Sequence, residues 1–299
     1  MYSNVMVTGG CGFIASNFLN IMKKRYPETH FVNIDKLDYC SNVENVEPGV
    51  ATFIKGNVGN AELIENLIKE YKFDAIFHFA AQSHVDNSFE NAISFTMDNT
   101  YATHVLIEAC RQFIPDVEFI HFSTDCVFTG KKGNYSEKDF RDAKDLYGIS
   151  KKNGEDLKKN NTLILRTSFI GHELFDNKSL LSWFLKTKQK NIQGYSKAFF
   201  SGLTNLEISK FIYSIIVKKN FYPGIFNLSG SKISKYELLK IINTKYKLNK
   251  SINKDEALKI DRSLLNKKII KKFKFKNKSW NKLIDQMKND FDIYKKNLY

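Results

Sequence analysis

The sequence predicts an α/β fold built on a doubly wound parallel sheet, followed by a smaller, partly helical C-terminal domain. Short apolar segments of strand length alternate with amphipathic helical segments through the first half of the chain. A glycine-rich turn joins the first strand segment to the first helical segment. After about residue 170 the alternation loosens into helical stretches around short apolar runs. These observations favour one large sheet domain with a small domain after it.

Six short apolar runs are the expected strands of the first half, each bounded by polar or glycine-containing turns. They lie at residues 5–7, 31–34, 52–54, 75–79, 118–122 and 163–165. Helical periodicity is found at residues 13–22, 61–71, 94–113, 151–159, 180–188, 206–218, 235–247 and 280–294. We predict a sheet domain over residues 1–170, with a return segment near 200–229, and a second domain made mainly of residues 171–299.

Composition excludes several classes of protein. The chain of 299 residues is 42% hydrophobic, enough for a sizeable core. No apolar run approaches the roughly 20 residues that cross a bilayer, and no secretory signal is expected at the start. The four cysteines are scattered without a C-x-x-C pair, which argues against a zinc site or a disulfide framework. We therefore expect a cytoplasmic protein with no metal and no membrane association.

The net charge of +14 comes entirely from the second half. Residues 1–150 carry 13 Lys and Arg against 20 Asp and Glu, whereas residues 151–299 carry 33 against 12. Only five of the basic residues are Arg, the side chain suited to bidentate phosphate and base contacts. We therefore predict no nucleic-acid partner, and expect the Lys-rich run at 266–278 to be a strand or helix with a solvated lysine face.

The turn after the first strand has the pattern of a phosphate-binding turn. Residues 8–16 read TGGCGFIAS, in which Gly9 permits a tight turn and Gly12 leaves room for a pyrophosphate to approach the backbone. Small Ala15 lets the helix pack on the strand, and the helix N-terminus then faces the phosphates. Asp35 follows 20 residues after Ala15, at the end of the second strand. This order of elements predicts a Rossmann-type dinucleotide site.

The same region bears on the choice between NAD(H) and NADP(H). A carboxylate at Asp35 accepts hydrogen bonds from ribose hydroxyls and disfavours a 2′-phosphate. Lys36 follows immediately, and a cation there would partly tolerate that phosphate. The sequence favours NAD(H) and leaves NADP(H) open.

A Tyr-x-x-x-Lys pattern, Tyr147 and Lys151, stands at the start of a helix after the fifth strand. Spacing of four residues places both side chains on one helical face. A nearby ammonium would stabilise the Tyr147 phenolate and make the phenol usable for proton transfer. Thr124 ends the fifth strand, where its hydroxyl would hydrogen-bond a substrate carbonyl. We predict these three residues to be the catalytic set.

With these motifs the chain resembles the extended short-chain dehydrogenase/reductase superfamily over essentially its whole length. The motifs are TGGCGFIAS, HFAAQSHVDNS, DNTYATH, STDCVF, YGISK and LRTSFIG. Residues 1–110 look most like the nucleotide-diphosphate-glucose 4,6-dehydratases, notably in DKLDYCSNVENV. Residues from 119 onward look like the dTDP-4-dehydrorhamnose reductase group, notably in STDCVFTGKKGNYSEKD and IDRSL.

The resemblance implies two sets of binding residues. For the dinucleotide it implies Gly9, Gly12, Phe13, Ile14, Asp35, Lys36, Asn57, Val58, Phe79, Ala80, Ala81, Asn99, Tyr147 and Lys151. For a nucleotide-diphosphate sugar it implies Ser83, His84, Asp125, Cys126, His172 and Arg262. His172 has the alternative of satisfying loop backbone, and Arg262 is expected to contact the diphosphate.

One departure separates the two groups. The dehydratases carry Thr-Asp-Glu at the end of the fifth strand, where Asp and Glu act as acid and base, whereas this chain has Thr124-Asp125-Cys126. With Cys126 in the place of the base, the resemblance implies reduction of a nucleotide-linked 4-keto-6-deoxyhexose (dTDP- or UDP-4-dehydrorhamnose-like) and not dehydration. Asn57 stands where many relatives have Asp near the adenine.

Two other readings remain open. The same three residues serve an epimerase that retains NAD, and some reductase-like relatives are regulatory subunits that bind dinucleotide without catalysis. Homodimers through helices of the first domain are common in the superfamily, so the resemblance implies a second copy of this chain as the partner to test.

Overall fold

The computed structural model describes residues 2–83, 88, 91–157, 160–173, 179–218 and 220–296. The chain forms two compact units. The first consists of Met1–Val127, Arg141–Arg166 and Ser209–Phe226, and the second of Phe128–Phe140, Thr167–Ile208 and Asn227–Tyr299.

The segment Phe128–Phe140 belongs to the second unit, whereas the sequence analysis placed it in the first domain. Its backbone forms hydrogen bonds with residues 263 and 265, which also belong to the second unit. Tyr135 donates its backbone N–H to the Ser263 carbonyl at 2.8 Å, and Leu265 donates to the Tyr135 carbonyl at 2.8 Å. These partners lie more than 120 residues away along the chain, so no local sequence pattern predicts them.

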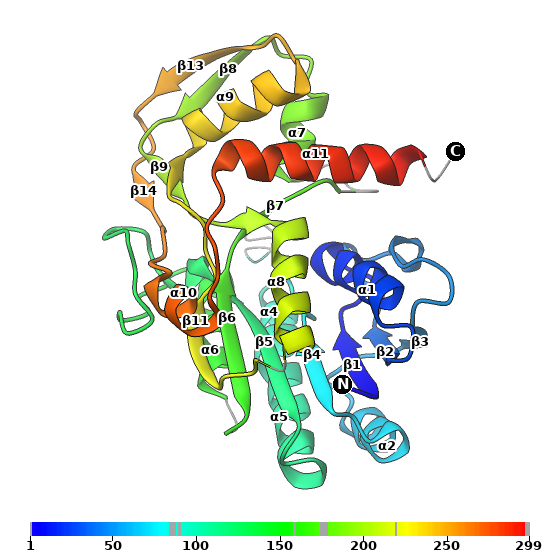
Figure 1. Ribbon diagram of the computed structural model, residues 1–299. Helices are drawn as coiled ribbons and strands as arrows, with labels where there is room; N and C mark the ends of the chain where they lie inside the picture. Colours follow the sequence, from blue (N-terminus) through cyan, green and yellow to red (C-terminus); the bar gives the residue numbers. More distant parts are fainter. Residues whose placement is uncertain are drawn as a thin grey trace. The chain divides into compact units, whose positions relative to one another are not determined.

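The first unit is built on a seven-stranded sheet in the order β11-β6-β5-β4-β1-β2-β3, which confirms the predicted doubly wound α/β fold (Figure 1). The pairs β1–β2, β2–β3, β1–β4 and β4–β5 are all parallel. The strands are β1 Asn4–Thr8, β2 His30–Asp35, β3 Thr52–Lys55, β4 Ala75–His78, β5 Glu118–Thr124, β6 Thr162–Thr167 and β11 Gly224–Asn227.

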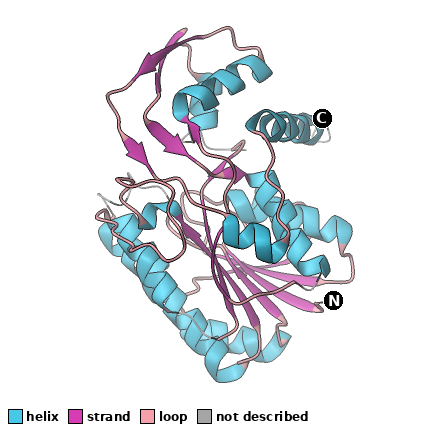
Figure 2. Cartoon of the chain, turned by 60° about the vertical axis from the view of Figure 1, so that its left-hand side comes forward, coloured by secondary structure: helices cyan, strands magenta, loops and turns pink. Residues whose placement is uncertain are grey.

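Helices of the first unit lie on both faces of this sheet (Figure 2). Strand residues alternate between the faces. Met6 and Ile76 pack with α2 and α5 in one apolar cluster. Phe77 points to the other face and packs against Phe18 of α1, with ring centroids 5.0 Å apart. The helices are α1 Phe13–Arg25, α2 Ala61–Tyr71, α4 Ala92–Thr96, α5 Ala102–Phe113, α6 Leu146–Asp156 and α8 Asn205–Lys218, with short 3₁₀ turns η1 Val43–Asn45 and η3 Asp125–Val127.

The long helix predicted over 94–113 contains an irregularity. It begins at Ala92 as α4, passes through a π-helical turn, η2 Met97–Tyr101, and continues as α5. A π turn inserts a residue into the helical repeat and is frequently found at functional sites. In this chain it carries Asp98 and Asn99, two adjacent polar residues that both have tertiary partners.

The second unit combines small sheets with helices. Two-stranded sheets are formed by β7–β10 and by β8–β13, and β12–β9–β14 form a third. Their bounds are β7 Phe169–Ile170, β8 Asn191–Tyr195, β9 Ala198–Phe200, β10 Leu203–Thr204, β12 Ile233–Ser234, β13 Ser251–Asp255 and β14 Ile260–Asp261. The helices are α7 Leu180–Lys186, α9 Lys235–Tyr246, α10 Lys267–Phe273 and α11 Trp280–Lys296.

The Lys-rich run is partly helical. In α10, Ile269 and Phe273 are buried while Lys267, Lys268 and Lys271 are exposed, as expected for a solvated lysine face. In the described part of the chain, no helix combines the length and the apolar character that a bilayer crossing requires.

Candidate active site

The turn between β1 and α1 places backbone groups of glycine residues at the carboxyl end of β1. Gly9 has a positive φ of 70°, and its N–H donates to the Ile34 carbonyl of β2 at 2.8 Å. A Cβ on Gly9 would lie 2.7 Å from the Ala80 backbone, so only glycine fits there. Gly12 precedes α1, and no side chain caps that helix. The helix N-terminus, which begins with Phe13 and Ile14, therefore has the geometry of an anion site.

Replacing Gly9 with Ala is expected to lower the free energy of unfolding by about 1–3 kcal/mol, because Ala must adopt a left-handed conformation and meets the Ala80 backbone. Gly49→Ala is the matched control, since Gly49 has a φ of 74° with nothing within 4 Å of its Cβ. Chemical denaturation of both variants measures the difference. Equal losses would contradict a close approach at Gly9.

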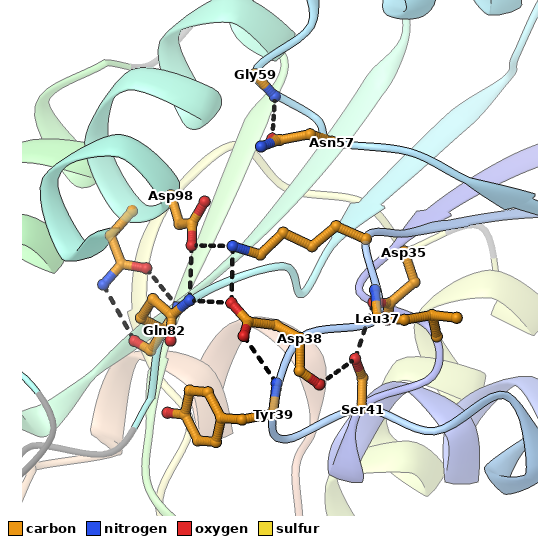
Figure 3. A network of polar contacts seen from close by, with 11 residues as sticks. Asp35, Leu37, Asp38, Tyr39, Ser41, Asn57, Gly59, Gln82 and Asp98 are labelled. Atoms are coloured by element: carbon orange, nitrogen blue, oxygen red, sulfur yellow. Dashed lines mark hydrogen bonds and ion pairs between the residues drawn. The ribbon is translucent and has the colours of Figure 1, made fainter. Parts of the chain in front are cut away.

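Asp35 is fixed at the carboxyl end of β2. Its carboxylate is 6% exposed and accepts hydrogen bonds from the Cys11 N–H at 3.0 Å, the Leu37 N–H at 2.9 Å and the Ser41 hydroxyl at 3.0 Å. Leu37 takes a positive φ of 58°, an uncommon conformation for this residue type, which the bond to Asp35 stabilises. The carboxylate thus organises the loop beside the glycine turn (Figure 3).

Lys36 is not free in the structure. Its ammonium contacts the Asp98 carboxylate at 2.6 Å and the Asp38 carboxylate at 2.8 Å. The Gln82 side-chain amide donates to the same two carboxylates, at 2.7 Å each. We call Lys36, Asp38, Gln82 and Asp98 the Lys36 clamp (Figure 3). The sequence analysis singled out Lys36 but missed the other three, and the π turn that places Asp98 has no sequence signature.

Asn99 links this clamp to the helix that carries Tyr147. Its side-chain oxygen accepts the Gln82 backbone N–H at 2.8 Å, and its side-chain NH₂ group donates to the Ser150 hydroxyl at 2.9 Å. The Ser150 hydroxyl in turn donates to the Tyr147 carbonyl at 2.8 Å. Asn99 is 1% exposed, so these bonds are held away from solvent.

The remaining residues predicted to bind the dinucleotide fall into two groups. Phe79 and Ala80 continue β4 beside the glycine turn, and both donate N–H bonds to Thr8, to its carbonyl at 3.1 Å and its hydroxyl at 3.3 Å. Ala81 follows, half-buried. Asn57 is exposed after β3 and accepts the Gly59 N–H at 2.8 Å, while Val58 beside it is buried in the core.

The three predicted catalytic residues lie close to the carboxyl end of β5. Thr124 is the last residue of that strand, and Tyr147 lies in α6, where it is 8% exposed. Lys151, one helical turn after Tyr147, donates to the Phe122 carbonyl of the same strand at 2.7 Å. Gly148 makes this possible, because a Cβ there would lie 2.3 Å from the Cys126 carbonyl oxygen. The α6 helix therefore packs directly on the strand end.

Electrostatics around Tyr147 differ from the sequence-based expectation. Burial raises the pKa of the Tyr147 phenol above its usual value of 10, and the charges of Cys126 and Asp125 raise it further, while the Thr124 side chain lowers it. Lys151 is not among the groups that shift it. The lysine is itself affected: burial lowers the pKa of Lys151 to about 8, against an opposing effect of Glu155.

This shift predicts the pH dependence of any activity that requires the Lys151 ammonium. As the pH rises through about 8, Lys151 loses its proton, so the rate is expected to fall on the alkaline side. Lys151→Arg retains its charge up to about pH 12 and is expected to be slower but to lack this alkaline limb. Rates measured from pH 6 to 10 test the assignment, and an unchanged limb in the Arg variant would refute it.

Of the residues predicted to bind substrate in the first unit, two adjoin Thr124. The Asp125 carboxylate accepts the Thr124 hydroxyl at 3.3 Å and the Cys126 thiol at 3.7 Å. Ser83 is exposed at the end of the loop after β4. His84 lies outside the described residues. Within the described part of the chain, no three His, Cys, Asp or Glu side chains gather as metal ligands.

The other two lie in the second unit and have contacts of their own. The His172 ring stacks on Phe291, with centroids 3.7 Å apart, and a ring nitrogen hydrogen-bonds the Tyr246 hydroxyl at 2.7 Å. Arg262 donates from Nε to the Phe128 carbonyl at 3.0 Å. His172 thus takes part in packing against α9 and α11.

A parallel seven-stranded sheet with a glycine turn after β1 and a Thr–Tyr–Lys set at the end of β5 defines an extended short-chain dehydrogenase/reductase. The family model described as GDP-mannose 4,6 dehydratase matches residues 6–187. The chain belongs to this family.

Similar proteins carry several activities. A trifunctional UDP-glucose 4,6-dehydratase/UDP-4-keto-6-deoxy-D-glucose 3,5-epimerase/UDP-4-keto-L-rhamnose-reductase of Arabidopsis thaliana is 46% identical over 129 residues, which are 42% of this chain and 19% of that protein. The match thus spans about a fifth of that relative's length.

Two solved structures are similar over nearly the whole chain. A dTDP-glucose 4,6-dehydratase of Bacillus anthracis, in complex with NAD, has a TM-score of 0.79 at 23% identity, covering 95% of this chain and 94% of its own. A dTDP-4-dehydrorhamnose reductase of Clostridium acetobutylicum has a TM-score of 0.79 at 16% identity, covering 97% and 99%. At these identities the likeness concerns the fold.

Proposed function

We propose that the protein is a nicotinamide-dependent reductase of a nucleotide-linked 4-keto-6-deoxyhexose. The observation that carries this proposal is the cluster at the end of β5, where the Thr124 side chain lowers the pKa of the buried Tyr147 phenol and Cys126 adjoins Thr124. A hydroxyl pair suits a carbonyl oxygen that gains a proton, whereas removal of a proton from carbon needs a base. Cys126 occupies the place where dehydratases carry that base.

The first unit fits a dinucleotide. The Gly9–Gly12 turn leaves room that a Cβ would fill, and the uncapped N-terminus of α1 suits a pyrophosphate. The Asp35 carboxylate at the end of β2 would accept ribose hydroxyls, and Asn57 and Val58 lie where the adenine would contact the loop after β3. When bound, the nicotinamide supplies the hydride for the sugar carbonyl.

The chain's own residues handle the proton and the orientation of the substrate. Thr124 and Tyr147 donate hydrogen bonds to the carbonyl oxygen, and Tyr147 delivers the proton to that oxygen as charge develops on it. The buried Lys151 ammonium, which donates to the Phe122 carbonyl one turn away from Tyr147, would hold ribose hydroxyls of the bound dinucleotide. Thr124 donates its one hydroxyl proton to the Asp125 carboxylate, so it would exchange that partner for the carbonyl oxygen when substrate binds.

The deciding experiment offers purified protein NADH or NADPH with a dTDP- or UDP-linked 4-keto-6-deoxyhexose and follows absorbance of the reduced cofactor. The proposal expects oxidation of the cofactor and a 6-deoxyhexose product. It also expects no dehydration of dTDP- or UDP-glucose, because the base is missing. Conversion of those glucose nucleotides would favour a dehydratase, and interconversion of sugars by tightly bound cofactor without net oxidation would favour an epimerase. Cofactor binding without turnover would favour a regulatory subunit.

We further propose that the protein is a homodimer through the helix containing the π turn. Ile93, Met97 and Tyr101 follow one another at four-residue spacing and are 79%, 46% and 46% exposed. Such a row is unusual on a solvent-facing helix. Ile93→Arg with Met97→Arg is expected to yield a monomer by light scattering, whereas Phe140→Arg, at a residue 81% exposed in the second unit, leaves a dimer. A monomeric wild type would disprove the proposal.

A further inference from the structure

The Lys36 clamp places one cation between two carboxylates at the end of β2. Both contacts are short, at 2.6 Å to Asp98 and 2.8 Å to Asp38, and Gln82 bridges the same two carboxylates. The Lys36 side chain is 35% exposed, and that of Asp98 only 13%. Partial burial lowers the pKa of Lys36, but its hydrogen bonds to Asp38 and Asp98 raise it above its ordinary value overall. The cation is therefore permanently charged and committed to internal partners.

The position of the clamp gives it a consequence for cofactor choice. In Rossmann-type domains the residue at the end of the second strand meets the adenosine ribose, and a nearby cation is what accommodates a 2′-phosphate. Lys36 directly follows Asp35, so it is the cation in the right place. Its pairing decides whether it is available for that phosphate.

We infer that Asp38 and Asp98 are specificity-determining residues, which neutralise Lys36 and so exclude the 2′-phosphate of NADP(H) in favour of NAD(H). This inference rests on the proposed binding of a nicotinamide dinucleotide. The formal charge of Lys36, Asp38 and Asp98 together is −1, and with Asp35 it is −2. A phosphate monoester brings a further charge of about −1.5 to −2 at neutral pH, so it would meet like charge beside a lysine that is already paired.

Further hydrogen bonds hold the residues of the Lys36 clamp in place around the Lys36 ammonium. Gln82 is tied through its backbone to the Asn99 side chain, with bonds of 2.8 and 3.1 Å, and Asn99 is tied to Ser150 of α6. Asp98 precedes Asn99 in the π turn, so both side chains are fixed by the same helical irregularity. For Lys36 to turn toward a phosphate, it would have to abandon two charge-assisted hydrogen bonds.

Dissociation constants of NADH and NADPH for wild-type protein and variants test the inference. The wild type is expected to prefer NADH. Asp38→Asn with Asp98→Asn keeps the side-chain shapes and is expected to improve NADPH binding relative to NADH by roughly tenfold or more, since each lost carboxylate removes a charge that repels the phosphate. Adding Lys36→Met to that variant should abolish the gain. Asp285→Asn, which removes a carboxylate paired with Lys245 at 2.7 Å in the second unit, should leave the ratio unchanged.

A measurement on the wild type guards against misfolded variants. Repulsion of the 2′-phosphate is screened by salt, so NADPH binding relative to NADH should improve as ionic strength rises. A relative loss of NADPH binding with salt, a wild type that prefers NADPH, or an unchanged ratio in the folded double variant would each overturn the inference. Failure of the wild type to bind either cofactor would instead refute the proposed function on which it rests.

Discussion

Tyr147→Phe is expected to reduce kcat for the 4-keto sugar by roughly 10²–10⁴-fold while the dissociation constant of the reduced cofactor changes little. Tyr147 is only 8% exposed, so removal of its hydroxyl takes away the proton donor and leaves the ring packed edge-on against Phe95, with centroids 6.2 Å apart. Single-turnover rates with saturating cofactor measure the loss directly.

The control for this variant is Tyr135→Phe. Tyr135 is also buried, at 3% exposed, and its hydroxyl accepts one hydrogen bond, from the Lys132 N–H at 3.0 Å. Its loss should therefore cost similar packing and bonding without changing the rate. Full activity in Tyr147→Phe would remove Tyr147 as the acid, and an equal loss in both variants would show that the effect is structural.

The local parts of this molecule were predictable from sequence because short-range pattern determines them. Strands β1 and β2 were expected from apolar runs and extend those runs by only one residue at each end. The Gly9 turn was predictable because positive φ and close approach both require glycine. Thr124, Tyr147 and Lys151 could be grouped because a strand end and a following helix meet in this fold.

Contacts between distant segments could not be predicted in this way. Strand β13, Ser251–Asp255, has mostly exposed, polar residues and owes its conformation to pairing with β8, Asn191–Tyr195, about 60 residues earlier. No apolar alternation marks it. The same holds for Lys36, whose neighbour Asp35 is visible in the sequence but whose partner Asp98 lies 62 residues away. The sequence therefore left the cofactor preference open.

The pKa of Tyr147 is another property that could not be predicted from sequence. The i, i+4 spacing predicts that Lys151 lies near the phenol, but not that its ammonium donates to the Phe122 carbonyl. Spacing along a helix determines which face two side chains share, whereas the partner of each polar atom depends on the strand beneath. Burial then becomes the largest influence on the pKa of both groups.

Beneath the catalytic cluster lies a buried ion pair that bears on stability. Arg166 of β6 and Glu155 of α6 form two hydrogen bonds, of 2.8 and 2.7 Å, and their side chains are 1% and 0% exposed. The Ser123 hydroxyl donates to the same Glu155 carboxylate at 2.5 Å, and Arg141 donates to it at 3.1 Å. Glu155 thus joins α6, which carries Tyr147 and Lys151, to the two strands β5 and β6.

Arg166→Met is expected to lower the free energy of unfolding by about 3–5 kcal/mol, because it leaves the Glu155 carboxylate buried without its main partner. Denaturant unfolding measures the loss. Arg111→Met is the control: Arg111 pairs with Glu108 on the surface, where both side chains are at least half exposed, and no measurable change is expected. Combining Arg166→Met with Glu155→Met should restore part of the lost stability, since the double variant leaves neither charge unpaired. If the two losses simply added, Arg166 and Glu155 would stabilise the fold independently and not as an ion pair that holds α6 to the sheet.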